Sequence, residues 1–123
     1  MANGGRRARR ARSARPDFTI ERGSPHSGIK YKVSPPTVHK TGGQTVTWEN
    51  TLNHDVRLEL YPSTGRLFGT GGVLEYVIPR GGPPLTHTII NSPDSATYPF
   101  GIIVRDGGAG TRAHAKSDGD VDV

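Results

Sequence analysis

The chain has 123 residues, with 16 Lys and Arg against 11 Asp and Glu, and it contains no cysteine. This length predicts a single domain. The lack of cysteine excludes disulfides, thiolate metal sites, iron–sulfur clusters and a cysteine nucleophile. No run of about 18 apolar residues occurs, so the sequence predicts no membrane-spanning helix. The 17 glycines and 10 prolines predict many turns and few long helices.

An amino-terminal arm, residues 1–16, carries the excess positive charge. The remaining chain has 10 basic and 11 acidic residues, so the net charge of +5 belongs to the arm. We expect the arm to be disordered when alone, because it has no apolar stripe to bury. Its guanidinium groups predict binding to nucleic acid or another anionic surface, without sequence preference because no aromatic residue is interleaved. The alternative is a solubilising tail. The residues concerned are Arg6, Arg7, Arg9, Arg10, Arg12 and Arg15.

The arm also bears on the compartment of the protein. Its paired arginines are followed by small and charged residues, whereas an export signal requires an apolar stretch. On this pattern we expect a cytoplasmic protein.

Residues 17–106 alternate apolar and polar side chains in short runs, which predicts β-strands because neighbouring side chains of a strand point to opposite faces. Strands are expected at 17–22 and 29–33, followed by a short extended piece at residues 38–39. Two further runs, 44–50 and 55–60, are expected to pair as a hairpin. The polar turn between them carries Asn50, Asn53 and His54.

Beyond Leu60, turn residues at 62–65 and a short apolar segment at 66–68 lead to a glycine-rich loop at 69–72. Strands are expected at 73–78, 85–90 and 96–105, and no stretch has a convincing helical pattern. Residues 107–123 are rich in glycine, alanine and charge, and are expected to form a disordered tail. Seven or eight short strands separated by Gly/Pro turns predict an all-β fold, an antiparallel two-sheet Greek-key sandwich.

Three segments of this pattern resemble the cupredoxin family. Residues 43–50, Gly-Gln-Thr-Val-Thr-Trp-Glu-Asn, are similar to the family strand G-(D/Q)-x-V-x-W-x-N. Residues 53–56, Asn-His-Asp-Val, are similar to the H-(N/D/T)-V start of its next strand. Residues 97–100, Thr-Tyr-Pro-Phe, are similar to its G-x-Y-x-(F/Y) strand. The resemblance covers about residues 17–106 and implies a cupredoxin-like sandwich.

The resemblance also implies a copper-ligand histidine at His54, but the rest of the ligand set is missing. A type 1 copper centre needs a thiolate and a second imidazole, usually with a weak thioether ligand. The chain has no cysteine, its one methionine is Met1, and the first histidine after the aromatic strand is His114. The sequence therefore excludes type 1 copper, and we expect no bound cofactor.

Two histidines remain as candidate metal ligands. His54 and His87 would hold Cu(II) or Zn(II) if their strands lie side by side, with Asp55 or His39 as a further ligand. The alternative for His54 is an imidazole that hydrogen-bonds a loop carbonyl. No nucleophile elbow occurs, and the glycine-rich stretches lack the lysine of a phosphate loop.

We therefore expect a non-enzymatic binding or structural module that contacts an unknown protein partner. Edge strands would make this contact by strand addition, or the end loops would make it. The loops considered are Asn50–His54, Gly69–Gly72 and Pro93–Ser95. Histidine-based metal binding and polyanion binding by the arm are the alternative functions.

Overall fold

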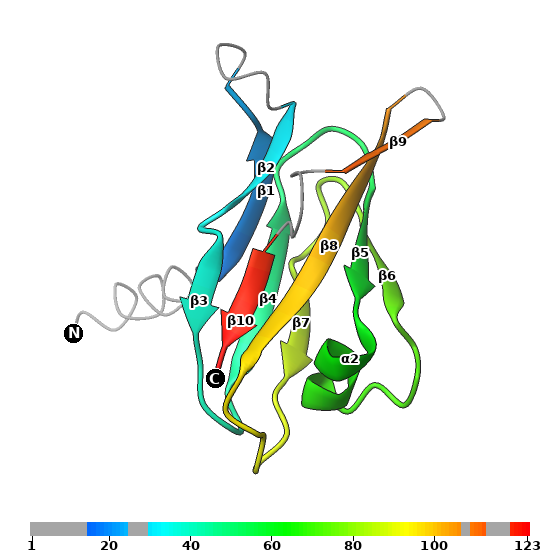
Figure 1. The fold of residues 1–123 in the computed structure, drawn as a ribbon. Coiled ribbons are helices and arrows are strands. Elements are labelled where there is room, and N and C mark those ends of the chain that lie inside the picture. The colour runs from blue at the N-terminus through cyan, green and yellow to red at the C-terminus, as the bar shows by residue number, and fades with distance from the viewer. Residues whose placement is uncertain (1–14, 25–29, 107–108, 113–118) are drawn as a thin grey trace, which may run out of the picture.

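The computed structural model describes residues 15–24, 30–106, 109–112 and 119–123, and it shows two β-sheets that enclose one core (Figure 1). The four-stranded sheet has the order β2 (Tyr31–Ser34), β1 (Phe18–Arg22), β4 (Thr45–Asn50), β7 (Leu85–Thr88). The other sheet has the order β3 (Thr37–His39), β10 (Gly119–Asp122), β8 (Thr97–Asp106), β5 (Val56–Leu60), β6 (Glu75–Ile78), and β9 (Ala109–Arg112) also pairs with β8.

The all-β class and the two-sheet sandwich are confirmed, but the expected antiparallel pairing is wrong in two places. β1 runs parallel to β4, and β3 runs parallel to β10. The expected hairpin is also wrong, because β4 and β5 lie in different sheets. The turn between them carries the chain from one sheet across to the other. A connection of this kind brings a strand next to a partner that is distant in sequence. The two strands can then pair either parallel or antiparallel.

The core forms from the inward-facing residues that the alternation predicts. Trp48 and Phe18 stack with ring centroids 5.9 Å apart, and the Phe100 ring packs edge-on against both. All three side chains are fully buried. The first two belong to one sheet and Phe100 to the other, so this aromatic cluster joins the inner faces of the sandwich.

The expected disordered tail, residues 107–123, is wrong at its end. Gly119–Asp122 forms β10, which lies between β3 and β8, and the Val121 side chain is fully buried. Gly119 packs against the Phe100 ring so closely that a Cβ atom would lie 2.5 Å from its Cζ. The alternation of Asp and Val is thus a strand pattern with valine inward. β9 lies in the same region, while residues 107–108 and 113–118 are outside the described residues.

One short helix, α2 (Pro62–Phe68), replaces the expected turn and apolar segment. Pro62 stands at its first turn, and Gly69, with φ of 63°, ends it. The hydroxyl of the buried Thr64 donates to the Pro99 carbonyl and fixes the helix to β8. Seven residues are too few for a helical period to show in the sequence. No helix in the described part of the chain is long and apolar enough to cross a membrane.

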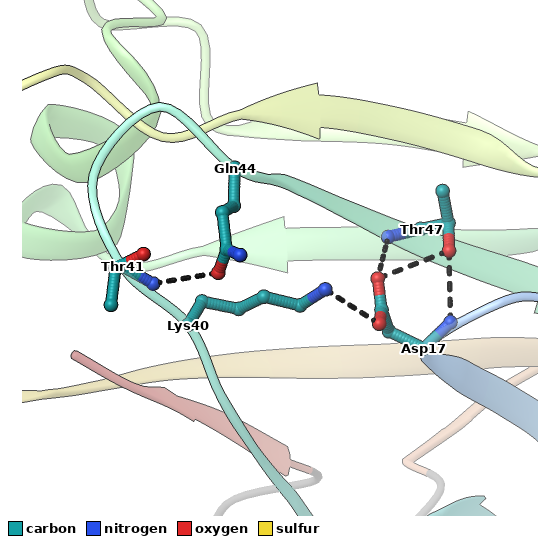
Figure 2. Close-up of polar contacts among 5 residues, drawn as sticks. All are labelled: Asp17, Lys40, Thr41, Gln44 and Thr47. Carbon is teal, nitrogen blue, oxygen red and sulfur yellow. Dashed lines mark hydrogen bonds and ion pairs between the residues drawn. The ribbon is translucent and has the colours of Figure 1, made fainter.

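The start of β1, where the arm meets the sandwich, is held by a polar cluster around Asp17 (Figure 2). The Asp17 carboxylate accepts a hydrogen bond from the backbone N–H of Thr47 at 2.9 Å and pairs with the Lys40 ammonium at 2.8 Å. The Asp17 N–H donates to the Thr47 hydroxyl. The residues that follow the arm are therefore fixed to β4. Of the arm's arginines, only Arg15 lies among the described residues, and it is exposed.

Candidate binding pocket beside the short helix

The two candidate metal ligands lie in different surroundings. The His54 ring contacts Tyr31 on β2 at a centroid distance of 6.3 Å, whereas the His87 ring lies among Trp48, Phe68 and Tyr76. β2 and His87's strand, β7, are the opposite edges of the four-stranded sheet. Three strand spacings of about 4.8 Å each separate those edges. The structure therefore does not bring the two imidazoles together.

The further ligands considered for a metal are engaged elsewhere. His39 pairs with Asp122 at 3.0 Å on the outer face, and the Asp55 carboxylate accepts a hydrogen bond from the Arg80 N–H. Within the ranges that the structure describes, no three His, Cys, Asp or Glu side chains are grouped to hold a metal ion. Nothing in this geometry supports a shared copper or zinc ion.

His87 faces the core, and aromatic rings surround its imidazole. The Phe68 ring stacks on it at 5.3 Å, and the Tyr76 ring packs edge-on at 4.5 Å. Its Nε2 atom is buried and has no hydrogen-bond partner. Burial in this apolar surrounding lowers the pKa of His87 below the usual 6.5, because the charged imidazolium loses its hydration.

This burial predicts a loss of stability in mild acid. Well above pH 6.5 the imidazole is neutral in both states, so the full stability is present. As the pH falls through about 6.5, the unfolded chain takes up the proton first and the free energy of unfolding falls. We expect His87→Phe to reduce this fall, as measured by urea unfolding between about pH 5 and pH 8. His39→Gln, which removes an exposed imidazole, is the control. An unchanged pH slope in His87→Phe would contradict the assignment.

A concavity in the described structure borders α2. It has a volume of about 560 Å³ and an apolar wall formed by helix and loop residues: Pro62, Gly65, Arg66, Gly69, Gly71, Gly72 and Leu74. We call it the α2 pocket. A second concavity, of about 390 Å³, shares Arg66 with it, and a third, of about 320 Å³, shares Pro62 and Leu74. Hollows therefore adjoin the helix on more than one side.

Glycine is required at several positions of the pocket wall. A Cβ atom at Gly65 would lie 2.6 Å from the Leu74 Cδ2, so its absence lets the leucine pack against the helix. Gly71 and Gly72 have φ angles of 69° and 98°, which other residues adopt only with strain. Open space surrounds both Cα atoms, with no heavy atom within 4 Å of a Cβ built on either. The loop thus leaves its backbone uncovered at the pocket.

Exposed apolar side chains gather around the same helix. Four large apolar side chains are exposed in the described structure: Tyr61, Val73, Val77 and Ile90. Tyr61 directly precedes α2, Val73 follows the glycine loop, and the Ile90 N–H donates to the Leu67 carbonyl of the helix. Large apolar groups left in water beside a pocket are typical of a binding surface.

The loops expected to contact a ligand fall at two ends of the sandwich. Gly69–Gly72 and Pro93–Ser95 border α2, whereas the turn Asn50–His54 lies at the opposite end (Figure 1). In that turn, the buried Asn50 amide donates to the carbonyls of His54 and Ile78. This asparagine therefore closes the far end of the sandwich and does not reach the pocket.

Arg66 is the pocket residue that sequence reasoning missed. It stands four residues after Pro62, on the same face of a helix that was not expected. The available signal was a proline followed seven residues later by glycine, the usual start and end of a helix. Comparisons of the chain with protein-family models, with curated proteins and with solved structures found no match.

Proposed function

We propose that this chain is a non-enzymatic binding module whose ligand site is the α2 pocket. The observation that carries the proposal is the coincidence of this pocket with Tyr61, Val73 and Ile90, three exposed apolar side chains around one short helix. Its volume of about 560 Å³ falls among small-ligand sites, which span about 300–1,000 Å³.

The composition of the wall supports binding over catalysis. Arg66 is the one ionisable residue among those that line the pocket. A guanidinium stays protonated at all physiological pH values, so it holds an anion but does not exchange protons with a substrate. General acid–base chemistry needs a group that titrates near the working pH. The wall supplies a charge and apolar surface, which are the means of binding.

We propose further that the sandwich is cupredoxin-like, with Greek-key connections and without type 1 copper. The support is the position of the three resembling segments. They fall on β4, at the start of β5 and on β8, and β5 pairs directly with β8 through Leu60 and Phe100. The thiolate that type 1 copper requires is absent from the chain.

A neutral apolar probe tests the binding function. We expect 1-naphthalenemethanol to shift the backbone amide signals of residues 65–74 in NMR spectra, because its ring system fits the apolar wall. Gly71→Asn should weaken binding several-fold, since asparagine tolerates the left-handed backbone and its side chain enters the open space.

The matched control is Gly81→Asn. Gly81 has a φ of 64° and equally open surroundings, but it lies in a turn outside the pocket wall. This variant should bind the probe as the original chain does. If the probe leaves the signals of residues 65–74 in place, or if both variants weaken binding equally, the α2 pocket is not the ligand site.

A further inference from the structure

Resting on this proposed function, we infer that the ligand of the α2 pocket is an apolar molecule with one carboxylate. The carboxylate is bound by the guanidinium of Arg66 and by the backbone N–H groups of Gly71 and Gly72. The apolar body lies against Pro62 and Leu74.

Arg66 presents a cation that has no counter-ion in the described structure. None of the four ion pairs described involves it, although Asp94 lines the adjoining hollow that Arg66 also borders. Its neighbours in the pocket wall are glycines, Pro62 and Leu74. A guanidinium matches a carboxylate through two parallel N–H donors, and such a pair is stronger beside apolar surface than in open water.

The glycine loop adds donors at the same wall. Among the residues that the structure describes, the N–H groups of Gly71 and Gly72 donate to no protein acceptor. Their neighbours in the loop are engaged: the Thr70 N–H donates to the Gly65 carbonyl, and the Val73 N–H donates to the Thr70 carbonyl. Consecutive free backbone N–H groups favour an anion.

The charges at the Pro62 and Leu74 edge of the α2 pocket indicate at which end the carboxylate of the ligand lies. Glu59 and Glu75 line the hollow that shares Pro62 and Leu74 with the α2 pocket. Glu75 is paired with Arg57 at 2.8 Å. The residues that line that hollow include two carboxylates, both already engaged, and no cation, whereas the other edge of the α2 pocket supplies Arg66. The carboxylate of the ligand therefore lies at the Arg66 edge.

The experiment compares 1-naphthaleneacetate with 1-naphthaleneacetamide, two probes that share an apolar body and differ in charge. At neutral pH we expect the acid to bind at least about tenfold more tightly than the amide, which corresponds to one charge-assisted hydrogen-bond pair. Arg66→Gln should remove this preference and leave the affinity for the amide unchanged. Arg80→Gln, at an exposed arginine of another loop, should keep the preference.

The amide signals of residues 65–74 separate the two proposals. If both probes shift them with equal affinity, and Arg66→Gln changes neither, the carboxylate assignment is overturned while the binding pocket stands. If neither probe shifts them, both proposals fail. The carboxylate could belong to a peptide chain terminus or to a free acid, and a tripeptide ending in phenylalanine, with a free or an amidated terminus, distinguishes the two. If the free-over-amidated preference of the peptide exceeds the acid-over-amide preference of the naphthalene probes, the ligand is a chain terminus. The reverse order assigns a free acid.

Discussion

Val121→Asp is expected to lower the free energy of unfolding by about 4 kcal/mol or more, because it places a carboxylate in the core without a partner. The Val121 side chain is fully buried, and its strand, β10, has neighbours on both sides. Val121 lies opposite Val38 on β3 and opposite Tyr98 on β8. The loss is a large part of the stability of a small domain, which is about 5–15 kcal/mol.

The control is the neighbouring residue, whose side chain points outward. Asp120 accepts one hydrogen bond from the Thr37 hydroxyl at an exposed position, so Asp120→Val should cost less than about 1 kcal/mol. Urea unfolding followed by the fluorescence of Trp48, the one tryptophan, measures both variants. If residues 119–122 were a disordered tail, both variants would lower the free energy of unfolding by a small and equal amount. That result would contradict the placement of β10 in the sheet.

The sequence predicts the buried side of most strands but not the partner of each strand. Alternation shows that Trp48 and Leu58 face a core, and both are fully buried. It carries no information on which sheet each strand joins, because both sheets bury one face. The exchange of β4 and β5 between sheets, and the two parallel pairs, are set by contacts between distant segments.

Elements that depend on distant contacts are the ones missed. β10 has four residues, two of them aspartate, and its local preference for a strand is weak. Its place between β3 and β8 supplies the hydrogen bonds and the cavity for Val121. The α2 pocket was missed in part for a similar reason. The glycine loop was predicted as a contact region, but Arg66 lies beside it on a helix of only seven residues, which is too short to predict from its pattern.

The separation of the two candidate metal ligands, His54 and His87, has a related reason. The alternation of β7 leaves open whether His87 points inward, and the neighbours of its ring come from three other elements, β4, α2 and β6. His54 follows β4, and its ring contacts β2, the edge of the four-stranded sheet opposite β7. The distance between two imidazoles therefore depends on the order of strands in the sheet, which residue type and alternation do not give.

The end of β4 and the turn that follows it hold two asparagines, Asn50 and Asn53, that the sequence does not distinguish. The Asn50 side chain is 8% exposed and makes three hydrogen bonds. Its amide nitrogen donates to the carbonyls of His54 and Ile78, at 2.8 and 3.0 Å, and its oxygen accepts from the Leu52 N–H at 2.9 Å. One side chain thus ties β4, in one sheet, to β6, in the other.

Asn50→Ala is therefore expected to lower the free energy of unfolding by about 3 kcal/mol, because two carbonyls and one N–H lose their partner at a buried position. Asn53→Ala should change it by less than about 0.5 kcal/mol. Asn53 is exposed, and only its backbone oxygen is engaged, by Arg80. Urea unfolding at neutral pH measures both.

A third variant separates the hydrogen bonds of Asn50 from its volume. Asn50→Asp keeps the size of the side chain and its acceptor for the Leu52 N–H, but it turns a carboxylate oxygen toward the carbonyls of His54 and Ile78. If the two donated bonds hold the sheets together, Asn50→Asp is at least as unstable as Asn50→Ala, because the buried charge adds repulsion to the lost bonds. A stability close to that of the original chain would show instead that the filled volume, and not the donor, holds this end of the sandwich closed.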